Sequence, residues 1–407
     1  MELFGQIVVY VIMACAIAGC IASVFKEDSA LGKEFLNGID SIGPIFLPVA
    51  GIMASAPYLT WFVSHVFGPL YGLVGADPCM AATTIIAVDM GGYQLAGALA
   101  ATKESWIMAM MTGYMAGATI VFSIPVALKM LRKEDRRYLA MGEMVGFITI
   151  PIGVLVSSII IALANPMIRE TMTTNGEATY ELALSFWLIF RNLIPLIIIC
   201  GAIAIGLYVI PEKMIKGFNV FGKVMDSMLR IVFVLCVVEY FTNVFSMIFG
   251  SWGFEPIIAD EVDINRALEI SGYIGIMLCG AFPMVYLIKT YLSRPLDAVG
   301  RRVGLSADAT AGILAATANV LALFGMVKDL VPVDKVKCIA YSVCCAFLIG
   351  DHLAFAANFQ PTLILPIMVG KLCGGCLAVY IATQFLKHKI LKSSGSCYQR
   401  DARTCFR

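Results

Sequence analysis

Long apolar segments recur along the whole chain, and each is long enough to cross a lipid bilayer. A membrane-spanning helix needs about 17–25 mostly apolar residues. Clear examples are the segments 7–25, 45–66, 107–128, 144–164, 182–209, 231–247, 270–291 and 362–385. The sequence therefore predicts an all-α, polytopic membrane protein.

The composition supports this class and excludes others. Hydrophobic residues make up 60% of the chain and charged residues 14%, against roughly 25% charged residues in soluble domains. The net charge of +1 argues against a nucleic-acid-binding surface as the main function. The sequence contains no Walker-type phosphate loop, which argues against ATP-driven transport by this chain alone.

The charges of the connecting loops indicate how the chain is oriented. Cytoplasmic loops are enriched in lysine and arginine. The basic connections, which we place in the cytoplasm, are 129–137, 213–230, 289–302 and the tail from Lys387. The acidic or weakly charged connections, which we place outside, are 67–77, 169–181, 250–263 and 350–361.

A count of crossings between these loops indicates one irregular segment in each half. Two apolar segments separate the outer loop 67–77 from the inner loop 129–137, although opposite sides require an odd number of crossings. The same mismatch occurs between 289–302 and 350–361. We expect segments 80–99 and 309–326 to be re-entrant or broken helices, since their centres are polar or contain glycine. The prediction is about nine transmembrane helices plus two such segments.

An internal repeat explains why each half of the chain contains one irregular segment, and we therefore compare the two halves residue by residue. Asp89 falls opposite Asn319, and other matches in the same order are Gly51-Ile52-Met53 with Gly275-Ile276-Met277 and Ile150-Pro151-Ile152 with Leu365-Pro366-Ile367. The loop charges make the two copies inverted, an architecture typical of secondary transporters. The expected parts are a first inverted repeat (1–181), a linking transmembrane helix (182–210), a second inverted repeat (211–390) and a disordered cytoplasmic tail (391–407).

Asp89 is the first candidate for the site, because it lies in the middle of an apolar segment. A carboxylate at mid-membrane costs about 2.5–3.5 kcal/mol, and its segment contains no lysine or arginine. We therefore interpret Asp89 as half of a substrate site whose ligand is a cation. Gly91 and Gly92 let the helix open and expose backbone polar groups there. Two alternatives stay open: a protonated or backbone-bonded carboxyl, and glycines that pack helices closely.

Three further side chains are candidates for the same site. Tyr93 offers a ring face or a hydroxyl to a small cation, although a packing role is the commoner one. Gln94 and Asn319 suit a neutral polar group on the ligand. Asn319 gains weight because it is the repeat counterpart of Asp89.

A second group of candidates lies near the ends of other apolar segments. Asp351 and His352 are adjacent, and together they suit a proton relay or the completion of a cation site. The alternative is a solvated loop at the membrane edge. Ser123 shares a helix face with Thr119, just before Pro125, which is expected to kink the helix. We expect these hydroxyls either to line the transport path or to donate hydrogen bonds to carbonyls of their own helix.

Several motifs closely resemble the ethanolamine-utilisation membrane protein family, EutH. The resemblance covers about residues 1 to 390. The motifs that carry it are Gly75-Ala76-Asp77-Pro78-Cys79-Met80, Val88-Asp89-Met90-Gly91-Gly92, Thr119-Ile120-Val121-Phe122-Ser123-Ile124-Pro125, Asp135-Arg136-Arg137-Tyr138, Ile210-Pro211-Glu212-Lys213 and Gly350-Asp351-His352-Leu353. The resemblance implies a multi-pass permease of the bacterial plasma membrane that brings ethanolamine into the cell for catabolism.

The chemistry of ethanolamine agrees with the candidate residues. The molecule is mostly a small cation at neutral pH, and Asp89 with Asn319 or Gln94 would bind its ammonium and hydroxyl groups. The expected partners are ethanolamine and membrane lipid, with no nucleic acid, cofactor or metal. A passive channel for a small amine remains an alternative. An intramembrane aspartyl protease that uses Asp89 and Asp351 is a remote alternative. That class needs a Gly-x-Gly-Asp motif, and here Leu348 stands in place of the first glycine, before Ile349-Gly350-Asp351.

Overall fold

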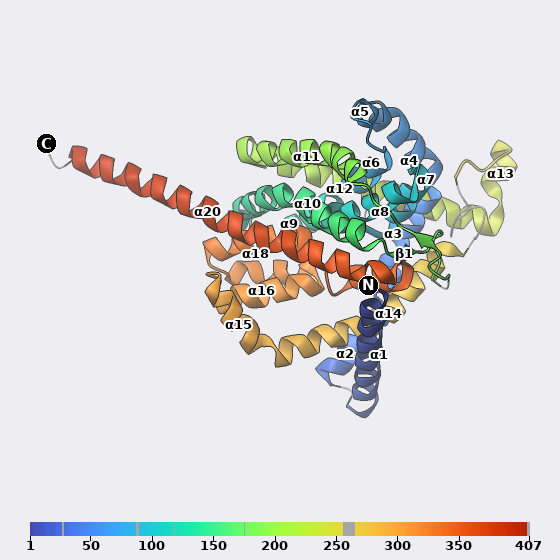
Figure 1. Cartoon of the computed structure of the whole chain (residues 1–407), viewed down its shortest axis with the longest axis horizontal. Helices are drawn as coiled ribbons and strands as arrows, with labels where there is room; N and C mark the ends of the chain where they lie inside the picture. Colours follow the sequence, from blue (N-terminus) through green and yellow to red (C-terminus); the bar gives the residue numbers. More distant parts are fainter. Residues whose placement is uncertain (27, 87–88, 118, 175, 255–264, 405–407) are drawn as a thin grey trace.

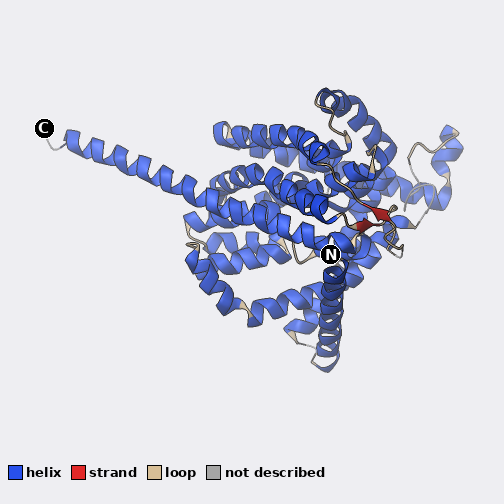
Figure 2. Ribbon diagram, viewed as in Figure 1, coloured by secondary structure: helices blue, strands red, loops and turns tan. Residues whose placement is uncertain are grey.

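The computed structural model describes residues 1–26, 28–86, 89–117, 119–174, 176–254 and 265–404. Within these ranges, the side chains of residues 89, 90, 117 and 388–404 are not described. The described chain is almost entirely helical (Figure 2), which confirms the predicted all-α class. The exception is a short antiparallel pair of strands, β1 (Met167–Ile168) and β2 (Tyr180–Glu181).

The first part of the chain forms helices of very unequal length. In order these are α1 (Glu2–Phe25), α2 (Ala30–Asp40), α3 (Ile42–Ala54), α4 (Ala56–Phe62), η1 (Val63–Phe67), α5 (Gly68–Leu73), α6 (Cys79–Ala81), η2 (Ala82–Ile86), α7 (Asp89–Leu99), α8 (Lys103–Thr112), η3 (Gly113–Gly117), η4 (Thr119–Ser123), α9 (Ile124–Met130), η5 (Lys133–Asp135) and α10 (Arg136–Ala164). The elements η1 to η4 are wide π-helical turns, which occur often at functional sites.

The second part begins after the strand pair. Its helices are α11 (Phe186–Val209), α12 (Pro211–Thr242), α13 (Val244–Phe249), α14 (Arg266–Tyr291), α15 (Ser293–Arg302), α16 (Ala307–Ala318), α17 (Val320–Met326), η6 (Val327–Asp329), α18 (Pro332–Cys345), α19 (Asp351–Phe359), η7 (Pro361–Leu363) and α20 (Ile364–Thr404). Helix α20 extends far beyond the rest of the protein (Figure 1), into the segment 391–407 where the sequence predicts a disordered tail.

Seven helices of the described chain are long and apolar enough to cross a membrane. They are Glu2–Phe25, Ala30–Ala54, Lys103–Met130, Lys133–Ala164, Phe186–Val209, Arg266–Tyr291 and Pro361–Lys387. Large apolar side chains stay exposed on them, as on α11, where Ile197 is 53% and Ile205 is 66% exposed. Such surfaces suit contact with lipid. The protein is therefore a multi-pass, all-helical membrane protein.

The predicted span 45–66 differs from the structure in its position, and the predicted span 231–247 is divided at Asn243 between α12 and α13. The apolar segment 45–66 is divided at Ser55, and the membrane-sized helix is instead Ala30–Ala54, built from α2 and α3. Pro57 enters α4 at its first turn, a position that proline favours because its missing N–H has no partner there. The span therefore begins earlier than predicted and includes the polar end of α2.

Two segments are closed at their base by a buried aspartate. Asp77 precedes the segment 79–99, and its carboxylate accepts hydrogen bonds from the N–H groups of Cys79 (2.9 Å) and Ala101 (3.0 Å). Asp334 follows the segment 307–326, and its carboxylate accepts a hydrogen bond from the N–H of Ser306 (3.4 Å). Asp77 thus contacts residues at both ends of its segment, and the contact of Asp334 with Ser306 places the start of α18 beside the start of α16, so each segment returns close to where it began.

Two helices of the second part are interrupted, α16–α17 and α18–α19, and their interruptions are hydrogen-bonded to each other. Asn319 is extended between α16 and α17 (φ −156°, ψ 124°). Phe347, between α18 and α19, has a φ of +60°, which is rare for a bulky residue. The N–H of Phe347 donates to the carbonyl of Ala316 (3.1 Å), and that of Ile349 donates to Thr317 (2.9 Å). Each interruption thus supplies hydrogen-bond partners that lipid cannot.

A buried ion pair joins two segments at the end of the molecule where the basic loops gather. The ammonium of Lys335, at the start of α18, lies 2.5 Å from the carboxylate of Asp135, beside α10. Lys337 donates to the carbonyl of Gly304 (2.6 Å). The start of α18 therefore lies beside both the loop 129–137 and the loop that precedes α16.

Candidate functional site

A cavity of about 360 Å³ lies where the two parts of the chain meet. Its walls come from α2 and α3, from the start of α7, from α14, and from the interruptions beside α17 and α19. The residues that line it are Asn37, Asp40, Ser41, Pro44, Ile45, Pro48, Val49, Ile52, Gly91, Phe122, Phe282, Asn319, Leu321, Phe347 and Asp351. Because interrupted helices expose backbone polar groups, this is where a polar ligand finds partners.

The ionisable side chains among these described lining residues are both carboxylates. Asp40 is the last residue of α2, and Asp351 is the first residue of α19. Asp351 thus stands at a helix N-terminus, where backbone N–H groups face an acidic side chain favourably. The lining therefore gives the cavity a negative character.

One face of the α2–α3 helix presents acceptors along the cavity. Asp40, Pro44, Pro48 and Ile52 follow at intervals of four residues, and all four line the cavity. Pro48 lies inside α3 and has no N–H, so the usual helical hydrogen bond to the carbonyl of Pro44 does not form. This face thus combines a carboxylate with a carbonyl oxygen that lacks its helical donor, a combination suited to an ammonium group.

Aromatic rings and a carboxamide complete the walls. Phe122 and Phe347 contact each other with their ring centroids 6.1 Å apart, and Phe282 lies on another wall. An aromatic face attracts a cation. Asn319 accepts a hydrogen bond from the N–H of Leu321 (2.8 Å), which caps α17 and fixes the carboxamide at the cavity.

A second hollow of about 520 Å³ continues from the first. The two share Asn37, Ser41, Phe282 and Asn319, and the second also reaches Lys289 at the last turn of α14. Lys289 begins one of the loops that the sequence places in the cytoplasm. The two hollows together reach from the cavity to the last turn of α14.

Three of the residues proposed from the sequence lie at this cavity. They are Gly91, Asn319 and Asp351, which come from distant parts of the chain. A Cβ atom added to Gly91 would lie 2.5 Å from Cδ1 of Ile52, so a glycine is required where α7 approaches α3. Asp89 is the first residue of α7, but its side chain is outside the described part of the structure.

Tyr93 has a packing environment away from the cavity. Its ring stacks on Trp106 with centroids 4.6 Å apart, and its hydroxyl accepts a hydrogen bond from Nε2 of Gln360 (2.9 Å). Gly92, Gln94 and Ser123 are also buried, and none of them is among the described residues that line the cavity. Phe122 takes the place at the wall that we expected for Ser123.

His352 separates from its neighbour Asp351 and faces a buried lysine. Its Nδ1 lies 2.8 Å from the ammonium of Lys371, which also donates to the carbonyl of Tyr114. Lys371 is 0% exposed and His352 is 2% exposed. This contact holds the imidazole of His352 against α20.

Two important residues were missed by the sequence analysis, although the sequence carried a signal for each. Lys371 is a single lysine within the apolar segment 362–385, and a charge at that depth indicates a functional or structural site. Asp40 lies four residues before Pro44, in a stretch that precedes the predicted span 45–66. An earlier start of that span would have placed Asp40 within the membrane.

Comparisons with known proteins agree with one another. A family model described as "Ethanolamine utilisation protein, EutH" matches residues 4–385. The chain is 36% identical over 388 residues to "Probable ethanolamine permease EutH" of Listeria monocytogenes, covering 94% of this chain and 95% of the relative. It is 38% identical over 367 residues to the protein of the same name in Escherichia coli K12, covering 88% and 86%. No solved structure matches the chain.

Proposed function

Because the chain belongs to the EutH family of ethanolamine utilisation proteins, we propose that it carries ethanolamine across the bacterial plasma membrane into the cell, for use in catabolism. The observation that carries this proposal is the cavity lined by Asp40 and Asp351 between the two parts of the chain. Relatives carry the name "Probable ethanolamine permease EutH", and the cavity has the chemistry that a small cation needs.

Each part of ethanolamine has a suitable partner at the cavity. The ammonium group binds the carboxylate of Asp351, the carboxylate of Asp40 and the carbonyl of Pro44, which has no helical donor because Pro48 lacks an N–H. Phe122 and Phe347 contribute ring faces beside the charge. The amide group of Asn319 donates to the hydroxyl oxygen of the ligand. Asp89 remains part of this proposal, since its helix α7 begins two residues before Gly91.

The architecture that we propose is that of two inverted repeats. The same kinds of element follow one another in both repeats. Each has two spans, then one or more short helices, then a segment whose ends are brought together at Asp77 or Asp334, then an interrupted span and finally a long span. We assign 1–181 and 211–390 to the repeats, with α11 as the link. This gives about nine crossings and two re-entrant segments, the latter being 79–99 and 307–326. The nine include α12 and α18–α19 in addition to the seven apolar spans.

The membrane potential is sufficient to drive uptake of a cation by uniport. A potential of about 100 mV, negative inside, contributes about 2.3 kcal/mol per charge, which is roughly 50-fold accumulation. A carrier of this kind needs no coupled ion.

Uptake of labelled ethanolamine into liposomes that contain the purified protein tests the proposal. We expect saturable uptake that rises with an imposed interior-negative potential and exceeds that of empty liposomes. Uptake equal to that of empty liposomes contradicts the proposal. Flux that rises in proportion to concentration without saturation instead supports the alternative, a passive channel for the amine.

A further inference from the structure

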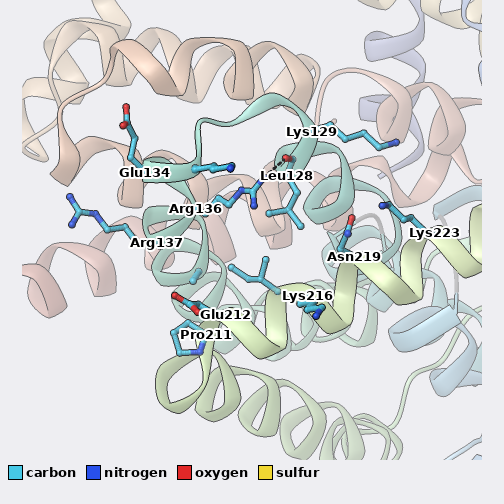
Figure 3. A pocket seen from close by; sticks show the side chains of 13 residues that line it. Leu128, Lys129, Glu134, Arg136, Arg137, Pro211, Glu212, Lys216, Asn219 and Lys223 are labelled. Carbon is cyan, nitrogen blue, oxygen red and sulfur yellow. Dashed lines mark hydrogen bonds between the residues drawn. The ribbon is translucent and has the colours of Figure 1, made fainter.

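A third hollow, of about 890 Å³, lies between the α9–α10 connection and the first turns of α12 (Figure 3). It is separate from the cavity described above and shares no lining residue with it. Its ionisable lining residues are Lys129, Lys133, Arg136, Arg137, Lys216, Lys223, Glu134 and Glu212. Basic side chains therefore outnumber acidic ones three to one.

The basic side chains come from both walls of the hollow. Figure 3 shows Lys129 and Arg136 on the α9–α10 side and Lys216 and Lys223 on the α12 side. Positive charges held around one hollow repel one another, and an anion between them removes this repulsion. A preference for basic cytoplasmic loops explains the charges themselves. It does not explain why two distant segments face each other across one space.

The acidic residues at this hollow do not neutralise it. Glu134 lies 3.7 Å from Arg132, which is not a lining residue, and its side chain is 73% exposed. Glu212 stands in the first turn of α12, where a carboxylate is favoured by the helix N-terminus. Glu212 therefore offsets the positive N-terminal end of α12, and the positive charge that faces the hollow from α12 comes from Lys216 and Lys223.

An apolar surface continues from the basic hollow along α12. Lys216 also belongs to a shallower hollow lined by Lys213, Gly217, Val220, Phe221 and Val224. Val220 is 53% exposed and Val224 is 59% exposed. A ligand with phosphate groups and an acyl chain matches both surfaces, whereas a free phosphate matches only the first.

We infer that this hollow binds the headgroup of an anionic phospholipid of the inner leaflet, with its phosphates between the two walls and an acyl chain along Val220 and Val224. Basic pockets between transmembrane helices on the cytoplasmic side are suited to such headgroups. Two walls with basic side chains favour a lipid that carries two phosphates, such as cardiolipin, over one that carries a single phosphate. The bound lipid bridges the two parts of the chain at their cytoplasmic ends.

The test compares lipid binding by the purified, full-length protein and two variants, using native mass spectrometry and thermal unfolding. Lys216→Gln/Lys223→Gln removes two charges from the hollow, at exposed positions where folding tolerates the change. Arg294→Gln/Arg301→Gln is the matched control, because it removes two exposed charges from α15. The probes are cardiolipin, phosphatidylethanolamine and inorganic pyrophosphate.

We expect cardiolipin to bind and to stabilise the wild type and the control. The Lys216→Gln/Lys223→Gln variant should bind cardiolipin roughly 30-fold more weakly, which corresponds to about 1 kcal/mol per charge. Equal weakening in the α15 control would show a general effect of surface charge and overturn the proposal. Stabilisation by pyrophosphate as strong as that by cardiolipin would overturn the lipid assignment in favour of a soluble phosphate compound.

Discussion

The carboxylate of Asp77 lies 3.0 Å from the backbone nitrogen of Ala101, across the whole segment 79–99. The same side chain accepts from the N–H of the buried Cys79 and so holds both ends of the segment. The backbone N–H of Asp77 donates to the carboxamide of the buried Asn192 in α11 (2.9 Å), which fixes the base of the segment against a neighbouring helix.

Replacing Asp77 with alanine should therefore destabilise the protein. The N–H of Cys79 loses its acceptor in a buried position, at a cost of about 1–3 kcal/mol. We expect a lower midpoint of thermal unfolding in detergent and faster hydrogen exchange within the segment 79–101. Asp28→Ala is the control, because the side chain of Asp28 is 96% exposed. Equal shifts in both variants would contradict the role assigned to Asp77.

The buried pair of Lys335 and Asp135 offers a second test of how the two parts are held together. Removing one partner leaves a buried charge without compensation, so Lys335→Met should cost about 3–5 kcal/mol. The double variant Lys335→Met/Asp135→Leu should recover most of this loss, because no buried charge remains. Thermal unfolding of the four proteins in the cycle measures the coupling. Losses in the double variant equal to the sum of the single ones would show that the two residues do not interact.

A third prediction concerns the close approach of α7 to α3. Gly91→Val places new atoms where Ile52 already lies, and overpacking of this kind costs about 1–3 kcal/mol. We expect reduced ethanolamine uptake, because Gly91 and Ile52 both line the cavity. The double variant Gly91→Val/Ile52→Ala should regain part of the uptake by restoring space.

Gly72→Val serves as the control for this substitution, since a Cβ atom on Gly72 meets nothing within 4 Å. Its uptake should stay close to that of the wild type. Normal uptake by Gly91→Val would show that the contact with Ile52 does not shape the cavity.

The features that the sequence predicts best are those that the bilayer itself constrains, namely the length of apolar helices and the number of crossings between loops. Apolar length fixes the helical class, and the parity of crossings points to segments 80–99 and 309–326. In the structure the corresponding segments 79–99 and 307–326 have bases closed by Asp77 and Asp334. The comparison of the repeats selects Asn319, which lies at the cavity.

The sequence predicts least where the partner of a side chain comes from a distant helix. Tyr93 stands beside the candidate glycines, yet its ring packs against Trp106 and its hydroxyl bonds to Gln360. His352 follows Asp351, yet a helix turns successive side chains to different sides, and His352 contacts Lys371 of α20. Asp40 was missed because the predicted span began at Ile45, whereas the membrane-sized helix of the structure runs from Ala30 to Ala54 and includes α2.

The most direct test of the central claim measures whether ethanolamine stabilises the purified protein through the charge of Asp351. A ligand at about 100 times its dissociation constant stabilises the state that binds it by about 2.7 kcal/mol. We expect ethanolamine to raise the unfolding midpoint increasingly with its concentration, both for the wild type and for the control Asp329→Asn, which changes an exposed residue. We expect little or no rise for Asp351→Asn. An equal rise in Asp351→Asn, or an equal rise of the wild type with uncharged ethylene glycol, would contradict the central claim.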